Sequence, residues 1–251
     1  MISLLHTAVL VASMATAVTA NASLTPASSI DDSPLFASIP FEELTLEHMD
    51  VRQIIPMPIN GMSAIDNAGQ VMYASSNGRF VFIGQMYDLW KGGALETMEE
   101  IEQASTRIYL DGLQLHPRDL NTVTIGNGPI DITIFTDPLC EHCHALAHEA
   151  KAYGDDYTFY FVVVPALGDE SHELAQRLHC AENPSEGTEA LLNGTINLLA
   201  TRENCDLEGY EKTLLASEVL GVDGVPFLIH QDGRVNRGRP QHLEQWLQGG
   251  R

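Results

Sequence analysis

The alternation of apolar and polar residues is clearest over Ile130–Phe135, and it predicts a buried strand. The residues Ala145–Ala152 have helical spacing, and the apolar run at 157–165 predicts a second strand. A strand, a helix and a strand in this order favour a parallel βαβ unit, because parallel strands need a crossover connection.

The flanking residues extend this unit into a mixed α/β domain that we place at residues 120–251. Further strands are predicted at residues 122–125, 226–230 and 235–238, and further helices at 170–181, 185–200, 207–220 and 241–247. The last two strands are joined by Gln231-Asp232-Gly233-Arg234, which predicts a hairpin.

The first half of the chain has a different pattern, with short β segments between turn residues. Strands are predicted at residues 54–58, 62–66, 71–74 and 80–85. The intervening Asn60-Gly61, Asn67-Ala68-Gly69 and Ser76-Asn77-Gly78 supply positive-φ positions, so the strands should form hairpins. A short helix is predicted near Phe41–Thr45. These elements define a first domain at residues 34–92.

This first domain has a thin core and is marginal alone, so it would gain stability by pairing with a copy of itself. The segment Met86–Trp90 ends it with exposed-looking apolar side chains. We interpret the segment as a dimer interface, with a loop folded back on its own domain as the alternative. Apolar residues at 95, 98, 101 and 104 then predict a helix over about 94–110, within a linker at 93–119.

The N-terminus resembles a secretory signal peptide at residues 1–20, with small residues before the expected cleavage after Ala20. An uncleaved anchor is the alternative. Residues 21–33 predict a flexible tail. Export would place the four cysteines in an oxidising compartment, where an even count fits two disulfides.

The net charge of −21 argues against nucleic acid and anionic membrane surfaces as partners. It indicates a well-solvated acidic surface.

The candidate reactive motif is Cys140-Glu141-His142-Cys143, which lies between the strand at 130–135 and the following helix. Cys140 is therefore predicted close to a helix N-terminus, where unpaired N–H groups and the macrodipole favour an anion. This should lower the pKa of the Cys140 thiol and make it the nucleophile. Cys143, one turn further on, should be more buried and within reach, as in a dithiol that opens and closes a disulfide.

These motifs resemble bacterial periplasmic disulfide isomerases of the DsbC/DsbG type. The matching stretches are residues 58–62, 84–88, 135–137 with 140–144, the pair Cys180 and Cys205, and 220–226. The resemblance implies a small cystatin-like α+β dimerisation domain, a linker helix, and a thioredoxin-like domain with a helical insertion. It also implies a V-shaped homodimer facing a shared apolar cleft.

The resemblance further implies a periplasmic enzyme that reshuffles wrong disulfides in unfolded or misoxidised exported proteins, without a cofactor. A membrane thiol donor of the DsbD type would keep it reduced. Pro226, if cis, would place the backbone of Val225 beside Cys140 for substrate binding. The alternative is an ordinary trans proline that opens a strand.

Two positions depart from the family pattern. Family isomerases commonly carry Gly-Tyr between the cysteines, whereas this chain has Glu141 and His142. A protonated His142 would stabilise the Cys140 thiolate and Glu141 would oppose it. Val225 stands where isomerases often have Thr, which alters the edge that contacts substrate.

Cys180 and Cys205 are too far apart in sequence for a redox motif, and we expect them to form a stapling disulfide. The alternative is a metal site using Cys140, Cys143 and two of His142, His144, His148, Cys180 or Cys205. Zinc sites usually show two short-spaced ligand pairs and only one is present, so we expect no metal.

Other functions remain open beside the isomerase. One is a dithiol oxidase, since His before the second cysteine resembles the strongly oxidising DsbA. Another is a DsbG-like reductase of sulfenic acids that protects single cysteines. The last is a chaperone-like module whose cleft binds unfolded chains.

Overall fold

The computed structural model of the chain describes residues 49–59 and 61–250. The predicted signal peptide at 1–20, the tail at 21–33 and the helix near Phe41–Thr45 lie outside the described residues. Among the residues that the structure does describe, no helix is long and apolar enough to cross a membrane.

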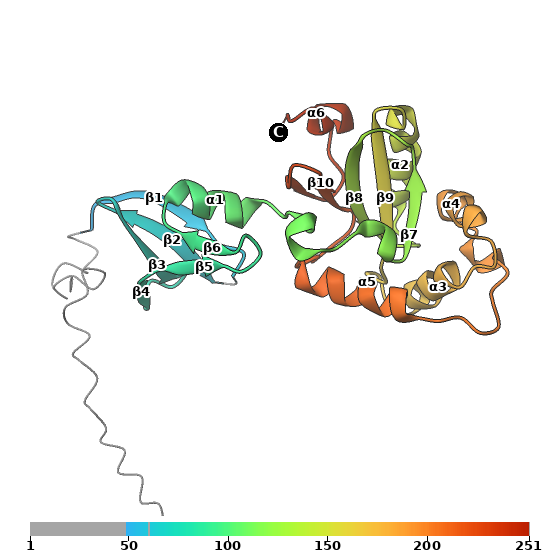
Figure 1. Ribbon diagram of the computed structural model, residues 1–251, viewed down its shortest axis with the longest axis horizontal. Helices are drawn as coiled ribbons and strands as arrows, with labels where there is room; N and C mark the ends of the chain where they lie inside the picture. Colours follow the sequence, from blue (N-terminus) through green and yellow to red (C-terminus); the bar gives the residue numbers. More distant parts are fainter. Residues whose placement is uncertain (1–48, 60, 251) are drawn as a thin grey trace, which may run out of the picture. The chain divides into compact units, whose positions relative to one another are not determined.

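The first domain contains an antiparallel meander of four strands, β1 to β4 in spatial order (Figure 1). The strands are β1 Val51–Pro56, β2 Met62–Asn67, β3 Gln70–Ser75 and β4 Val81–Ile83. The predicted turns are confirmed, since Gly61, Gly69 and Gly78 all have positive φ. At the middle turn Ala68 also has positive φ, and the N–H of Gly69 donates to the Asp66 carboxylate at 2.6 Å.

A separate two-stranded hairpin follows, formed by β5 Met86–Asp88 and β6 Gly93–Leu95. The prediction of one strand over 80–85 was therefore wrong at its end, because β4 stops at Ile83 and Met86 pairs with Leu95 instead. Leu95 is buried with Ile55, Tyr73 and Ile101 in the core of this domain.

The helix that we expected as a linker, α1 Met98–Thr106, is shorter than predicted at both ends, and its Ile101 belongs to the core of the first domain. Its start is fixed by a capping box, in which Glu100 N donates to Thr97 Oγ1 and the Glu100 side chain accepts from Thr97 N. Arg107 is already extended, and Ile108 N donates to Gly233 O at 2.8 Å. The residues after α1 therefore bond to the hairpin of β10 Phe227–His230 and β11 Val235–Arg237 instead of continuing the helix.

The second domain is built on a five-stranded sheet with the order β11-β10-β8-β9-β7. Its strands are β7 Thr122–Ile125, β8 Ile130–Thr136, β9 Tyr157–Val163, β10 Phe227–His230 and β11 Val235–Arg237. β8 and β9 are parallel, which confirms the predicted βαβ unit, and the other pairs are antiparallel.

Five helices accompany this sheet. They are α2 Glu141–Ala150, α3 Asp169–His179, α4 Pro184–Asn193, α5 Glu208–Val219 and α6 Leu243–Leu247. The predicted helix over 185–200 was too long, because Gly194 adopts φ +65° and ends α4 in a left-handed cap. A short 3₁₀ turn at Ile196–Leu198 follows.

The alternation along the central strands gives this domain apolar clusters on both faces of the sheet. Ile132 and Ile134 of β8 pack with Leu146 of α2, whereas Phe135 of β8 packs with Ala216 of α5. Neighbouring residues of a strand point to opposite faces, and β8 is covered on both, so every residue from Ile132 to Thr136 is buried. A mixed sheet with helices on both faces confirms the α/β, thioredoxin-like class that the resemblance implied (Figure 1).

The closing helix α6 is held on the β10–β11 hairpin through Trp246. Its ring is edge-on to that of His230, with centroids 5.9 Å apart, and the Arg234 guanidinium carbon lies 5.7 Å from it. Arg234 Nη1 also donates to Trp246 O at 2.7 Å. Burial lowers the pKa of His230 below its ordinary value, which favours the neutral ring in this contact.

We predict that Gly128→Ala destabilises the second domain by roughly 3 kcal/mol, because a Cβ there would collide with the backbone of Asp156 and Tyr157. Gly224→Ala is the matched control, since a Cβ there meets nothing within 4 Å. Urea unfolding followed by circular dichroism measures both. Equal midpoints for the two variants would contradict the packing argument.

Candidate active site

Cys140 ends the turn after β8 and caps α2. Its Sγ accepts the backbone N–H of Cys143 at 3.1 Å, and its own N–H donates to Asp137 O at 3.1 Å. Cys140 is in the extended region, with φ −82° and ψ 104°, as expected of a residue that precedes the first helical turn. The sulfur therefore lies at the positive end of the α2 macrodipole.

Cys140 and Cys143 form a disulfide with an S–S distance of 2.11 Å and a Cα–Cα distance of 5.2 Å. Cys140 is 7% exposed and Cys143 is 1% exposed. Cys140 is thus the member of the pair that solvent and reagents reach more easily.

A second loop lies against this pair. The carbonyl oxygen of Val225 is 4.0 Å from Cys140 Sγ, and the Val225–Pro226 peptide is cis. Phe227, directly after this loop, pairs in the sheet with Phe135 of β8, and their rings meet edge-on at 6.3 Å. Because β8 and β10 are antiparallel neighbours, the loop that follows β8 and the loop that precedes β10 meet at the same end of the two strands.

Glu141 and His142, the residues between the cysteines, are both exposed in the first turn of α2. His142 lines an open hollow of about 510 Å³ together with Arg239, Pro240 and Gln241. Arg239 is held there by Glu149 of α2, with Nη2 and Oε2 2.7 Å apart. The structure thus brings His142 together with the segment between β11 and α6.

Asp137 has a role in this site that the sequence analysis missed. Its carboxylate is fully buried and accepts the N–H groups of Leu139 at 2.7 Å and Leu167 at 2.9 Å, and the hydroxyl of Ser171 at 2.8 Å. A carboxylate is expensive to bury unless it is hydrogen-bonded. The signal in the sequence was an Asp placed directly after a buried apolar strand.

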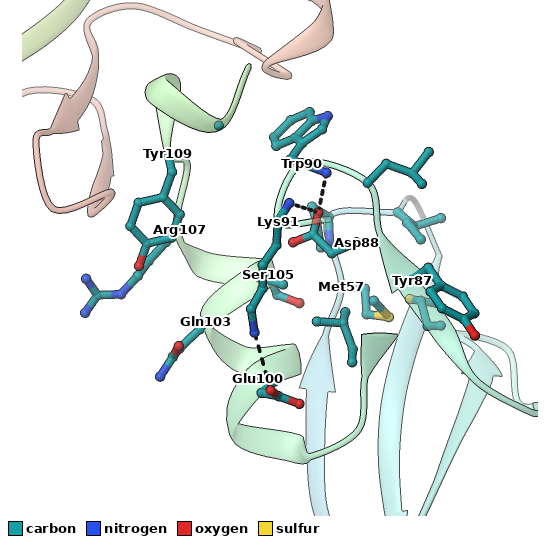
Figure 2. Close-up of a pocket in the computed structure, with 17 residues that line it drawn as sticks. Met57, Tyr87, Asp88, Trp90, Lys91, Glu100, Gln103, Ser105, Arg107 and Tyr109 are labelled. Carbon is teal, nitrogen blue, oxygen red and sulfur yellow. Dashed lines mark hydrogen bonds and ion pairs between the residues drawn. The ribbon is translucent and has the colours of Figure 1, made fainter. Parts of the chain in front are cut away.

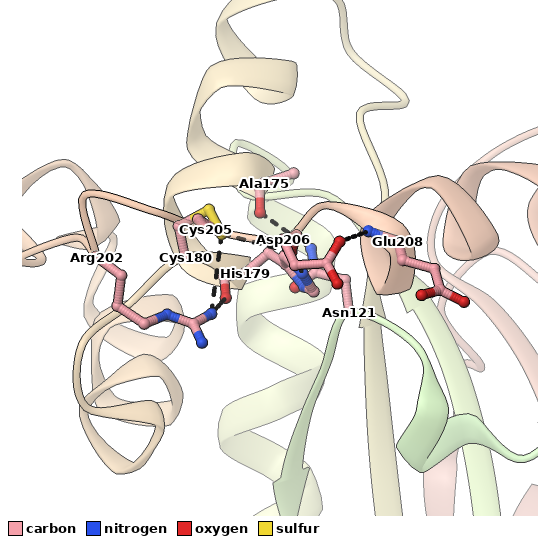
Figure 3. Close-up of a disulfide and its surroundings, with 8 residues drawn as sticks. All are labelled: Asn121, Ala175, His179, Cys180, Arg202, Cys205, Asp206 and Glu208. Carbon is pink, nitrogen blue, oxygen red and sulfur yellow. Dashed lines mark hydrogen bonds between the residues drawn. A yellow bond between two sulfur atoms is a disulfide. The ribbon is translucent and has the colours of Figure 1, made fainter.

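Cys180 and Cys205 form the second disulfide, with a Cα–Cα distance of 5.5 Å (Figure 3). It joins the C-terminal end of α3 to the loop before α5. Arg202 of that loop donates from N to Cys180 O at 3.0 Å and from Nη2 to His179 O at 2.9 Å. This bridge lies in the helical insertion between β9 and β10. The CxxC motif lies before β9, so the two disulfides belong to different segments of the domain.

Within residues 49–59 and 61–250, no group of three or more His, Cys, Asp or Glu side chains is arranged to hold a metal ion. His148, one of the ligands considered above, has its Nε2 3.0 Å from the backbone oxygen of Leu192.

We predict that iodoacetamide modifies Cys140 of the reduced protein ahead of Cys143, and about fivefold faster at pH 7 than an unperturbed thiol, since the start of α2 stabilises the thiolate. Mass spectrometry of timed samples measures both sites. The Cys140→Ser variant, which leaves Cys143, is the control. Faster modification of Cys143 would contradict the assignment.

We predict that replacing both Cys180 and Cys205 by Ala lowers the free energy of unfolding by about 3 kcal/mol, because the loop between them is no longer closed. Thiol–disulfide exchange at CxxC should stay within twofold of the original rate. The variant with Cys140 and Cys143 replaced by Ala is the control, since that bridge closes a much shorter loop and should change stability less. Loss of exchange in a folded protein would contradict a purely stabilising role.

Residues 41–97 match the family described as disulfide bond isomerase protein N-terminal domain. The thiol:disulfide interchange protein DsbC of Haemophilus influenzae is 22% identical over 184 residues, which is 72% of this chain and 76% of that protein. The protein of the same name from Escherichia coli K12 is 23% identical over 210 residues, covering 81% of this chain and 84% of its own.

A solved disulfide interchange protein from Neisseria gonorrhoeae aligns with 53% of this chain and 96% of its own, at 24% identity and a TM-score of 0.45. The resemblance first seen in the CxxC region and the turn motifs is confirmed by the sequence matches, which reach both domains. Over most of its length this chain is therefore similar to the thiol:disulfide interchange proteins named DsbC, and its residues 41–97 match the N-terminal domain of disulfide bond isomerases.

Proposed function

We propose that this protein is a periplasmic thiol:disulfide isomerase and reductase that repairs wrong disulfides in exported proteins. The observation that carries the proposal is the Cys140–Cys143 disulfide at the β8–α2 turn, with Cys140 Sγ capping the helix and Val225 O 4.0 Å away. The similarity to DsbC proteins over most of the chain supports the same activity.

The reaction begins with the reduced pair. The Cys140 thiolate attacks one sulfur of a substrate disulfide, forming a mixed disulfide and releasing the other substrate sulfur as a thiolate. The backbone N–H of Cys143, which bonds to this sulfur, favours the thiolate both as nucleophile and as leaving group.

Two outcomes follow from the mixed disulfide. In isomerisation, another substrate thiolate attacks the substrate sulfur and expels Cys140, so that the enzyme is unchanged. In reduction, the buried Cys143 attacks Cys140, releases the substrate thiol and leaves the enzyme oxidised. The second outcome requires an external dithiol to restore the enzyme, and a membrane donor of the DsbD type suits an exported protein.

Val225 and Pro226 form the substrate-binding edge in this proposal. The Val225 carbonyl lies beside Cys140 and just before β10, so an extended substrate can pair with it as a short strand. Glu141 and His142 are exposed on the same turn, where they are placed to tune the thiolate and contact the substrate.

The protein acts as a homodimer in this proposal, joined through the segment 84–90. Tyr87, Leu89 and Trp90 are 63%, 88% and 40% exposed, and a hollow of about 680 Å³ lies beside them (Figure 2). Its lining is largely apolar, including Met57, Ile59 and Leu95. In the described part of the chain no strand pairs with the outer edge of β5, and such an edge favours pairing with a second copy.

The turn between β5 and β6 presents these side chains in a fixed way. Asp88 Oδ1 accepts the N–H groups of Trp90 at 2.9 Å and Lys91 at 3.2 Å, and Lys91 Nζ lies 3.4 Å from Glu100 Oε1 (Figure 2). The apolar residues are therefore held on an ordered turn, which lowers the entropy cost of association.

The activity is tested with a scrambled disulfide protein incubated with the reduced enzyme. We predict that wild type restores the native activity of the scrambled protein, because the Cys140 thiolate opens its wrong disulfides. Cys140→Ala should abolish recovery, whereas the Cys180→Ala, Cys205→Ala double variant should retain it. No recovery with wild type would contradict the proposal, and a reduction potential near that of DsbA would favour the dithiol oxidase.

Dimerisation is tested by sedimentation equilibrium at micromolar concentration. We predict twice the mature chain mass for wild type, and the monomer mass for Leu89→Asp, because a charge in an apolar interface is costly to desolvate. Leu198→Asp is the matched control, since Leu198 is a similarly exposed leucine (75%) in the other domain. A wild-type monomer would exclude this interface.

A further inference from the structure

Two exposed leucines are connected by hydrogen bonds to the turn that carries the reactive cysteine. Leu139 is 39% exposed although it lies between the buried residues Pro138 and Cys140. Leu167, in the loop before α3, is 57% exposed. Single exposed leucines are common on protein surfaces and need no explanation by themselves. What distinguishes this pair is the group that holds both of them in place.

That group is the buried carboxylate of Asp137. Its Oδ1 accepts from Leu139 N and its Oδ2 accepts from Leu167 N, so the backbones of both leucines are bonded to one carboxylate. Ser171 Oγ, in the first turn of α3, supplies a third donor at 2.8 Å. All three donors are neutral.

The carboxylate therefore ties the loop after β8 to the loop after β9. Cys140 belongs to the same turn, because its N–H donates to the backbone oxygen of Asp137 at 3.1 Å. Leu139 thus lies in the turn that carries the sulfur, and the backbone of Leu167 is bonded to the same turn. Val225 lies against that sulfur from another loop.

We propose that Leu139 and Leu167 form a contact surface for an apolar side chain next to the cystine of the substrate, and that Asp137 is the residue that positions them. This inference rests on the proposed function and adds a substrate class to it, namely polypeptide disulfides with a large apolar residue beside the attacked cysteine. Asp169 and Glu170, which begin α3 after Leu167, disfavour an acidic residue at that place.

The test uses the reduced full-length protein and two peptide disulfides that differ only in one residue beside the cysteine, Leu in one and Ser in the other. Second-order rate constants are measured for both. Wild type should react about tenfold faster with the Leu peptide than with the Ser peptide, because partly burying one apolar side chain stabilises the complex by about that factor.

Four variants test which residues cause the preference for the Leu peptide over the Ser peptide. Leu139→Gln and Leu167→Gln should each reduce it to less than threefold, and Leu198→Gln should keep it. Arg177 near the end of α3 bonds to Leu199 O, so Leu198 lies toward the far end of that helix and serves as the matched control. In Asp137→Asn, an NH₂ group replaces one of the two carboxylate oxygens and faces a backbone N–H that it cannot bond. One leucine is then no longer held, so the preference for the Leu peptide should fall as in Leu167→Gln.

For Asp137→Asn the readout is the ratio of the Leu-peptide rate to the Ser-peptide rate. Removal of a buried charge in the Cys140 turn can change the reactivity of the thiolate, but it changes the rates with both peptides alike and cancels in the ratio. Alkylation of Cys140 by iodoacetamide over pH 6–9 measures that shared change separately. If this variant does not fold, the two exposed leucine variants still decide the proposal.

Equal rates of wild type with the two peptides would overturn the inference while leaving the proposed function intact. So would an equal loss of preference in Leu198→Gln, or an unchanged preference in both Leu139→Gln and Leu167→Gln. If neither peptide reacts with wild type, the proposed exchange activity fails, and this inference fails with it.

Discussion

The backbone N–H groups at the start of a helix have no acceptors within it, and in α2 the sulfur of Cys140 accepts one of them. This bond places a polarisable atom at the positive end of the helix, where negative charge is favoured. The same bond keeps Cys143 within reach of Cys140, and the two sulfurs form a disulfide. Much of the second domain can be understood as a support for this turn.

The sheet order explains how distant parts of the chain reach the turn. β8 is flanked by β9 and β10, so the loops that follow β8 and β9 and the loop that precedes β10 gather at one edge. These loops contribute Cys140, Leu167 and Val225 respectively. Asp137 joins the first two loops by hydrogen bonds, and the β8–β10 pairing joins the first to the third.

The parts of the fold that could be predicted from the sequence are those where one local signal dominates. The β8–α2–β9 unit has strong apolar runs, and the turns at Gly61, Gly69 and Gly78 need positive φ. The two cysteine pairs could also be predicted, since CxxC is a short motif and the lack of a second short-spaced ligand pair favoured a disulfide between the remaining two cysteines over a metal site.

Features that depend on contacts between distant residues could not be predicted in this way. β6 was assigned to a helix because Leu95 continues the helical spacing, whereas its strand conformation comes from pairing with β5. The early end of α4 was signalled by Gly194, but glycine is also tolerated inside helices. Nothing local to Asp137 shows that Leu167 and Ser171 will be its partners.

The environment of Trp246 has a practical consequence for studies of folding. The chain has two tryptophans, Trp90 in the first domain and Trp246 in the second. Trp90 is 40% exposed, whereas Trp246 is 7% exposed and packed against His230 and Arg234. Intrinsic fluorescence therefore contains one signal from each domain, and replacing either tryptophan by phenylalanine leaves a single-site reporter with which the unfolding of the two domains can be followed separately.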